Sequence, residues 1–407
     1  MKLTRAQHAA TSPSPASLAV PGSVALLCAV SFAPQLPGAM LNPILPDMAS
    51  GLGVSVAAIG QLSTVASLVG AIAALLMGTL SDLYGRRPFL LGGLVLICLG
   101  TFVLAVAPTF GWALASRVLV GLAGVGPVVF ALVGDWYRGS SRDQAIGRMV
   151  AFIAIAWVVG APAAAIIAQL GGWRMSVAVC GVLFLVVAGL ALVALPNQPP
   201  PRQEGGLSVA LATIWRSHRR RPDLALALLA NSLRTAAWIA FLTYVSILYR
   251  GIFQLETWQL GPVLALGAAA YALGSEAAGR LAARTPLRST LVVALVGMGL
   301  SGAVFPSLSF LPLSLAVMTG FCLLSGAADA SFTAMVLKLA PASRGATMSL
   351  NATLGGVGSA LGAAAAGIAI ATLGYPGLGI IVLGFALLSL VLISALLRRY
   401  DGRVSAR

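Results

Sequence analysis

Charged residues are scarce in this chain of 407 residues, because only 9% of it is Asp, Glu, Lys or Arg. Histidine is scarcer still, and its two copies, His8 and His218, lie in segments rich in Pro, Ser or Arg. A catalytic site would normally gather His, Ser or Cys side chains at one face, so an enzyme is not predicted. The sequence also lacks a phosphate-binding loop of the kind that holds nucleotides, which argues against ATP as the direct energy source.

Cysteine is equally rare and is not clustered. The four copies fall inside long apolar segments without paired spacing, at Cys28, Cys98, Cys180 and Cys322. Neither a disulfide framework nor a metal site is indicated, and we predict no cofactor. We interpret the cysteines as small residues packed in apolar helices.

Apolar residues make up 59% of the chain, and apolar runs of about 20 residues recur along its whole length. A soluble domain of this size could not bury so much apolar surface, so the solvent is predicted to be a lipid bilayer. The formal net charge of +15 would suggest a nucleic-acid partner in a soluble protein. Here the basic residues lie between the apolar runs, so no nucleic-acid partner is predicted.

Windows of about 20 residues predict twelve membrane spans in two sets of six. The first set is 24–40, 55–80, 89–106, 111–133, 145–169 and 176–195. The second set is 224–248, 260–282, 291–305, 313–337, 346–371 and 378–397. The sequence therefore predicts an all-α polytopic membrane protein.

Basic residues alternate from loop to loop, which indicates the orientation in the membrane. Clusters occur on one side only, at Lys2/Arg5, Arg86/Arg87, Arg138/Arg142/Arg148, 202–221, Arg280/Arg284/Arg288, Lys338/Arg344 and 398–407. The intervening loops carry only Arg174 and Arg250. The positive-inside rule then predicts a protein of the plasma or inner membrane with both termini in the cytoplasm.

The turn between the second and third spans carries the clearest motif. Residues 78–91 read GTLSDLYGRRPFLL, which resembles the signature loop of the major facilitator superfamily, G-x-L-x-D-R-x-G-R-R/K, with Leu83 as the one clear departure. In that family an Asp-Arg-Asp cluster latches the two halves of the transporter in the outward-facing state. The resemblance implies such a latch here, at Gly78, Asp82, Gly85, Arg86, Arg87 and Asp135. The alternative is that these charges only set the topology.

Two further segments resemble the same superfamily. Arg117, followed by Gly121, is similar to the fourth-helix Arg-x-x-x-Gly motif. Gly160 and Pro162 resemble the antiporter motif of the fifth helix, with Pro162 offset by one residue from the usual Gly-Pro. The resemblance is to the drug:proton antiporter group, which includes exporters of sugars and purine nucleosides. Small residues at this position also favour close helix packing in any membrane protein.

The second half of the chain repeats the first at an offset of about 201 residues, so that 279–284 falls on 78–83. The superfamily resemblance implies two pseudo-symmetric six-helix bundles in a protein that generally works as a monomer. We expect a disordered cytoplasmic tail at 1–21, bundles at 22–195 and 223–397, a basic linker at 196–222 and a second cytoplasmic tail at 398–407.

Three ionisable residues lie within second-half spans at a similar depth of about 10 to 15 Å, namely Arg234, Glu276 and Asp329. We expect Arg234 and Asp329 to form an ion pair that opens to a substrate anion or hydroxyl group, with proton uptake at Asp329 or Glu276. Arg117 is expected to face polar groups or the cavity. The alternative is a structural Arg234–Asp329 bridge, with Glu276 bonded to backbone near the membrane edge.

The predicted function is secondary active transport by alternating access, with protons and a small organic molecule as partners. The resemblance to antiporters favours proton-coupled efflux of drugs or of sugar- and nucleoside-like metabolites. Proton-coupled uptake and a non-transporting membrane sensor are the alternatives. Amides and aromatic residues expected to line the cavity are Gln35, Asn231, Trp238, Tyr244, Tyr271 and Asn351.

Overall fold

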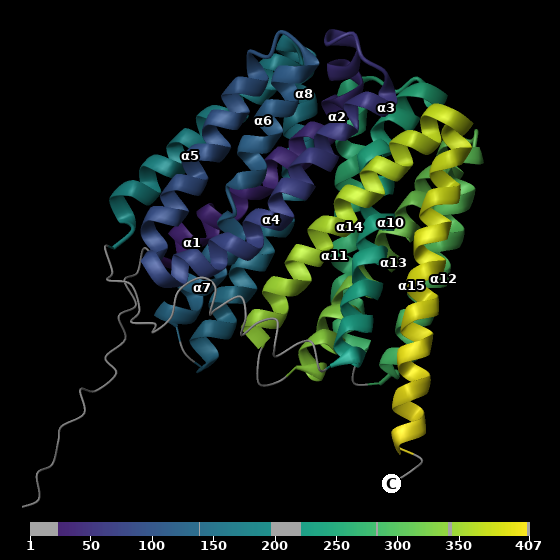
Figure 1. The fold of residues 1–407 in the computed structure, drawn as a ribbon. Coiled ribbons are helices and arrows are strands. Elements are labelled where there is room, and N and C mark those ends of the chain that lie inside the picture. The colour runs from purple at the N-terminus through teal and green to yellow at the C-terminus, as the bar shows by residue number, and fades with distance from the viewer. Residues whose placement is uncertain (1–22, 138, 197–220, 282–283, 341–343, 405–407) are drawn as a thin grey trace, which may run out of the picture.

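A computed structural model describes residues 23–137, 139–196, 221–281, 284–340 and 344–404, and these residues form an all-helical protein (Figure 1). Eleven of the helices in the described part of the chain are long and apolar enough to cross a membrane. A helix satisfies its backbone hydrogen bonds internally, which is why apolar sequence in lipid folds this way. The predicted tail at 1–21 and nearly all of the predicted linker at 196–222 lie outside the described residues.

The first half begins with three helical segments that follow one another without a break. In order, its elements are α1 (Ser23–Phe32), η1 (Ala33–Gln35), α2 (Leu36–Gly51), α3 (Val56–Ile59), α4 (Gln61–Tyr84), α5 (Arg86–Ala105), α6 (Phe110–Leu122), α7 (Val125–Trp136) and α8 (Gly139–Ala194). The second half contains α10 (Pro222–Phe253), α11 (Thr257–Leu281), α12 (Leu287–Val304), η2 (Phe305–Ser307), α13 (Leu311–Leu339), α14 (Arg344–Leu373) and α15 (Tyr375–Val404).

Helix α8 crosses the membrane twice, because its backbone is not helical at Gly171 and Gly172. Gly172 has a φ of 79°, a conformation that a residue without a Cβ adopts at little cost. The hydroxyl of Ser176, after this turn, donates a hydrogen bond of 3.0 Å to the carbonyl of Ala164, before it. The two segments therefore lie side by side, and with α8 counted as two, the described residues contain twelve segments that match the predicted spans.

The two halves pack together through small residues. Helix α4 contacts α14, and α8 contacts α11. A Cβ added at Gly356 would lie 2.8 Å from the Cβ of Ala71, and one added at Gly261 would lie 2.7 Å from the Cα of Pro162. A buried apolar cluster also crosses between the halves, with Ile44 and Phe241 among its members. Small residues such as glycine and alanine therefore allow the helices of the two halves to approach closely.

One predicted span boundary is wrong. The first span does not end near residue 40 but continues to Gly51, with Pro43 and Pro46 inside α2. Burial of Ile44 and Met48 in the cluster between the halves holds this last part of the helix. At the other end of the chain, the candidate span ends at Leu397, as predicted, and α15 itself continues to Val404.

Candidate functional site: a buried ion pair

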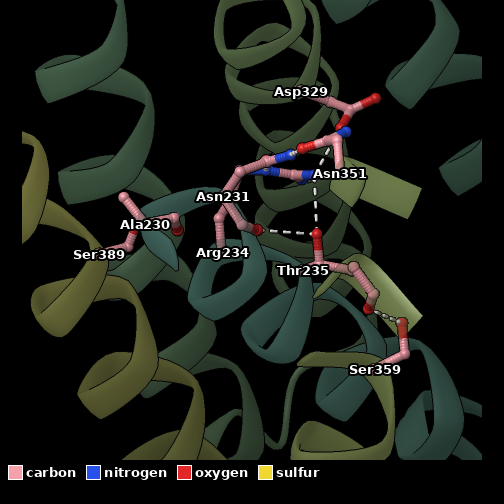
Figure 2. A network of polar contacts seen from close by, with 9 residues as sticks. Ala230, Asn231, Arg234, Thr235, Asp329, Asn351, Ser359 and Ser389 are labelled. Carbon is pink, nitrogen blue, oxygen red and sulfur yellow. Dashed lines mark hydrogen bonds and ion pairs between the residues drawn. The ribbon is translucent and has the colours of Figure 1, made fainter. Parts of the chain in front are cut away.

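The polar centre of the second half is an ion pair between Arg234 on α10 and Asp329 on α13 (Figure 2). Nη2 of Arg234 donates to Oδ1 of Asp329, across 95 positions of sequence. The Arg234 side chain is 3% exposed, whereas the Asp329 side chain is 38% exposed. The guanidinium is therefore held inside the protein, while the carboxylate keeps one side open.

Two further polar neighbours contact the guanidinium, and Asn351 supports one of them. Nε of Arg234 donates to Oδ1 of Asn231 at 2.8 Å, and Nδ2 of Asn231 donates to Oδ1 of Asn351 on α14 at 2.9 Å. Nη2 of Arg234 also donates to the hydroxyl of Thr235 at 3.2 Å, which itself donates to the Asn231 carbonyl at 2.8 Å. Residues three and four apart share one helix face, so α10 brings Asn231, Arg234 and Thr235 together locally. Thr235 was not predicted from the sequence.

One donor of this network is left over. Nη1 of Arg234 is buried and makes no hydrogen bond to the described residues. A buried donor without a partner costs about 1–3 kcal/mol. The guanidinium therefore keeps one donor that a further acceptor would satisfy.

Aromatic side chains adjoin the ion pair. Tyr271 on α11 lies near both Asp329 and Arg234. The rings of Tyr271 and Trp238 have centroids 4.8 Å apart, and Trp238 lies one helical turn after Arg234 on α10. Both rings are partly exposed. The site therefore has a charged side and an aromatic side.

The signature residues form a separate cluster at the end of α4. Arg86 pairs with Asp82 and, from its Nε, with Oδ2 of Asp135 at 3.0 Å. Its Nη1 also donates to the Ser81 hydroxyl at 2.9 Å. The turn into α5 needs Gly85, whose φ is 101°. All these ion pairs lie within the first half.

Two other signature residues contact the first half as well. Nη2 of Arg87 donates to the carbonyl of Leu192 at 2.9 Å, near the end of α8. A Cβ added at Gly78 would lie 3.8 Å from the Cβ of Pro127 on α7. These contacts attach the turn to the helices around it.

Two charged residues expected at the coupling site lie elsewhere. Glu276 pairs with Arg280 one turn later on α11 at 2.5 Å, and both side chains are exposed. Arg117 is buried in the first half, where it lines a small cavity together with Ser176 and Cys180. The ion pair of the second half is thus made by Arg234 and Asp329 without them.

The predicted cavity residues take several different roles. Gln35 accepts a hydrogen bond of 3.3 Å from the indole of Trp157. Tyr244 does not line a cavity, because it is completely buried. Its hydroxyl donates to the Ala363 carbonyl at 3.2 Å and lies 3.4 Å from the Ala57 carbonyl of the first half. A large aromatic residue in an apolar helix gives no sign of which helix it will face.

The glycine and proline of the fifth-span motif face two different neighbours. A Cβ added at Gly160 would lie 3.1 Å from the Leu36 side chain on α2. Pro162 instead meets Gly261 of the second half. The motif therefore packs α8 against one helix of each half.

A polar contact between the halves was missed in the sequence. Oδ1 of Asp47 on α2 accepts from Nη2 of Arg250 on α10 at 3.0 Å, and its Oδ2 accepts from the Thr257 hydroxyl on α11 at 2.5 Å. Nη1 of Arg250 also donates to the Leu255 carbonyl at 2.9 Å. We call this set the Asp47 gate. The one signal in the sequence was that Asp47 and Arg250 carry opposite charges and lie in loops between predicted spans where charged residues are few.

Comparison with known proteins identifies the fold and the class. The family model described as Major Facilitator Superfamily matches residues 27–330. The chain belongs to the major facilitator superfamily. This major facilitator is therefore a multi-pass membrane transporter and not an enzyme, and its two six-helix bundles are those of the superfamily.

Several relatives of this major facilitator have been named. It is 30% identical over 348 residues to the inner membrane transport protein YdhP of Escherichia coli K12, covering 82% of this chain and 85% of that one. It is 30% identical over 259 residues to a chloramphenicol resistance protein of Streptomyces lividans, covering 61% of this chain and 63% of that one. It is 26% identical over 242 residues to the purine ribonucleoside efflux pump NepI of Salmonella paratyphi A, covering 58% and 57%.

Solved structures share the fold of this transporter at low sequence identity. A mutant form of the nucleoside transporter NupG superposes with a TM-score of 0.75 at 15% identity, covering 92% of this chain and 99% of that one. A bacterial homologue of the human lysosomal transporter Spinster, in an inward-facing and occupied conformation, also gives 0.75 at 15% identity, covering 93% and 96%. At this identity the likeness concerns the fold alone.

Proposed function

We propose that this major facilitator exports small organic molecules in exchange for protons, with the Arg234–Asp329 pair as the binding and coupling centre. The observation that carries the proposal is the ion pair itself, in which a buried arginine faces a partly exposed carboxylate. Ionisable residues inside membrane segments are costly and usually functional. Relatives named for chloramphenicol resistance and for purine ribonucleoside efflux support export as the direction.

The charge of the ligand decides the sign of coupling at such a pair. An uncharged ligand that donates a hydrogen bond to Asp329 binds the ionised carboxylate more tightly than the protonated one, so a proton on Asp329 competes with it. An anion would instead take Arg234 from Asp329 and leave the carboxylate free to bind a proton. Competition gives antiport, whereas joint binding gives symport. The proposed export therefore requires ligands that bind the ionised form of Asp329.

The Asp47 gate and the signature cluster supply the two ends of an alternating-access cycle. Basic loops at the Arg86 end support a cytoplasmic location for that end and for both termini. The Asp47 gate joins the halves at the opposite end, while the pairs of Arg86 stay within one half. We assign this arrangement to an inward-facing state. In the outward-facing state the gate separates, and the Asp82 cluster holds the halves together instead.

We assign the moving units to the two bundles, 22–195 and 223–397, connected through 196–222 in a monomer. Each bundle has an apolar cluster of its own, with Phe184 in the first and Phe332 in the second. Where α4 meets α14 and α8 meets α11, the contacts between the bundles are made by small residues that can slide past one another. Rocking of one bundle against the other then exposes Asp329 to each side in turn.

Transport into inverted membrane vesicles tests this proposal. Labelled chloramphenicol and inosine serve as probes, and an imposed pH gradient, acidic inside, should drive accumulation of at least one of them by the wild type. Asp329→Asn should abolish this pH-driven accumulation. Its amide oxygen still accepts a hydrogen bond, so exchange of labelled for unlabelled probe should persist at a higher probe concentration, which shows that the protein still moves its ligand. Glu276→Gln is the matched control, because its carboxylate pairs with Arg280 away from the site, and it should stay coupled.

Two results would contradict the proposal. Full pH-driven accumulation in Asp329→Asn would remove Asp329 from the coupling step. Accumulation driven by a gradient of the opposite sign would show that probe and protons move together, which makes the protein a symporter.

A further inference from the structure

The aromatic side of the site has the geometry of a stacking surface. The rings of Trp238 and Phe321 are nearly parallel, with an interplanar angle of 13° and centroids 6.0 Å apart. Phe321 is completely buried and packs on Phe241 at 4.0 Å between centroids. Trp238 and Tyr271, in contrast, remain partly exposed. We call Trp238 and Tyr271 the aromatic shelf. Phe321 packs against Trp238, and Phe241 packs in turn against Phe321.

The aromatic shelf is continuous with the ion pair. Trp238 lies one helical turn after Arg234 on α10, and its ring contacts that of Tyr271, which lies near both Asp329 and Arg234. A ligand lying on the shelf therefore has its edge beside the open carboxylate of Asp329. Stacking supplies affinity for flat rings, and the carboxylate selects those that carry a donor on that edge.

The balance of charge in the site disfavours charged ligands. Arg234 and Asp329 neutralise one another when both are ionised. A ligand with a net charge would enter without a counterion in a medium of low polarity, and an uncompensated buried charge is strongly unfavourable. A lipophilic cation could stack on Trp238 but would meet a carboxylate that already has its partner.

We infer that the ligand is an uncharged, planar heterocycle whose ring lies on Trp238 while a ring N–H or an O–H donates to Asp329. This inference rests on the proposed function and specifies its substrate class. The class excludes both lipophilic cations and aromatic carboxylates. It also excludes non-aromatic sugars, which have donors but no flat face to stack.

Isothermal titration of the purified full-length protein tests the ligand class with four probes. Uridine has a flat ring and a ring N–H, and 3-methyluridine has the same ring with that donor removed. Tetraphenylphosphonium and benzoate supply the cationic and anionic comparisons. Uridine should bind most tightly. Removing a hydrogen bond to a charged group should weaken binding of 3-methyluridine about 10- to 100-fold.

Substitutions of Trp238 test where the ring lies. Trp238→Ala should weaken uridine binding about 5- to 150-fold, the range for loss of one base–aromatic stack. Trp238→Phe keeps a flat face and should bind nearly as well as the wild type, which distinguishes stacking from a general structural role. Trp112→Ala is the matched control, because Trp112 lies on α6 of the first half and is 55% exposed. Its affinity for uridine should not change.

The inference is wrong if uridine does not bind, or if it binds Trp238→Ala as tightly as the wild type. It is also wrong if tetraphenylphosphonium or benzoate binds more tightly than uridine and loses affinity in Trp238→Ala. Those results leave the coupling test intact, since Asp329→Asn in vesicles does not depend on uridine. Conversely, the expected titrations together with full coupling in Asp329→Asn would support the site and refute the proton pathway.

Discussion

The two partners of the buried ion pair should contribute unequally to stability. The substitution Asp329→Ala leaves Arg234 without a counterion, and the Arg234 side chain is only 3% exposed. Loss of one member of a buried pair costs about 3–5 kcal/mol when the remaining charge stays buried. Water cannot solvate the guanidinium without opening the packing between α10 and α13. We therefore expect the free energy of unfolding to fall by an amount in this range.

Removal of the other partner should cost less. In Arg234→Ala the remaining carboxylate is 38% exposed and can stay hydrated. The main loss is the hydrogen bond to Asn231, whose amide is buried and would lack its donor. An unsatisfied buried acceptor costs about 1–3 kcal/mol. Asp329→Ala should therefore be about 2 kcal/mol less stable than Arg234→Ala.

A double-mutant cycle measures this difference directly. Unfolding in mixed micelles with increasing dodecyl sulfate would be followed for the wild type, the two single variants and the variant that carries both changes. The double variant should be more stable than Asp329→Ala alone, because it no longer holds an unpaired guanidinium. Equal costs for the single variants, or additive costs in the double variant, would refute the assignment of Arg234 as the buried charge.

Two further predictions concern the end of the molecule that holds the Asp47 gate. Asp47→Ala removes contacts to both α10 and α11, which are worth about 0.5–1 kcal/mol for a partly exposed pair. Amide hydrogen exchange should therefore become faster at 44–52 and 250–260 but not around Arg86. Unchanged exchange rates at 44–52 and 250–260 would argue against a gate. Gly60→Ala should lower stability by about 1–3 kcal/mol, because the added Cβ would overlap the Tyr244 hydroxyl oxygen. Gly92→Ala, with nothing within 4 Å, is the control for the thermal unfolding measurement, and equal melting temperatures would contradict the packing argument.

Membrane spans and local turns could be predicted because they depend on neighbouring residues. Apolar runs of about 20 residues must become helices in lipid, whatever lies next to them. Gly85 in the signature turn is a similar case, since its φ of 101° suits a residue without a Cβ. The pairing of Arg86 with Asp82 likewise follows from their spacing on adjacent turns. These features involve contacts within a few residues of sequence.

The contacts between helices depended on tertiary structure. A helix that is apolar on every side has no sequence signal for its rotation, so its polar residues can face any neighbour. Glu276 and Asp329 looked equivalent in sequence, yet Glu276 pairs with exposed Arg280 and only Asp329 reaches Arg234. Tyr244 was expected in a cavity and instead joins the halves.

The sequence by itself determined the helices, their number and the superfamily resemblance, because the bilayer imposes length and composition on every span. Tertiary packing alone decided which side chains meet across long separations. Asp47 and Arg250 are 203 positions apart, and Arg234 and Asp329 are 95 apart. Close approach of small residues sets the rotation and depth of each helix, and these in turn place the few charges of the protein.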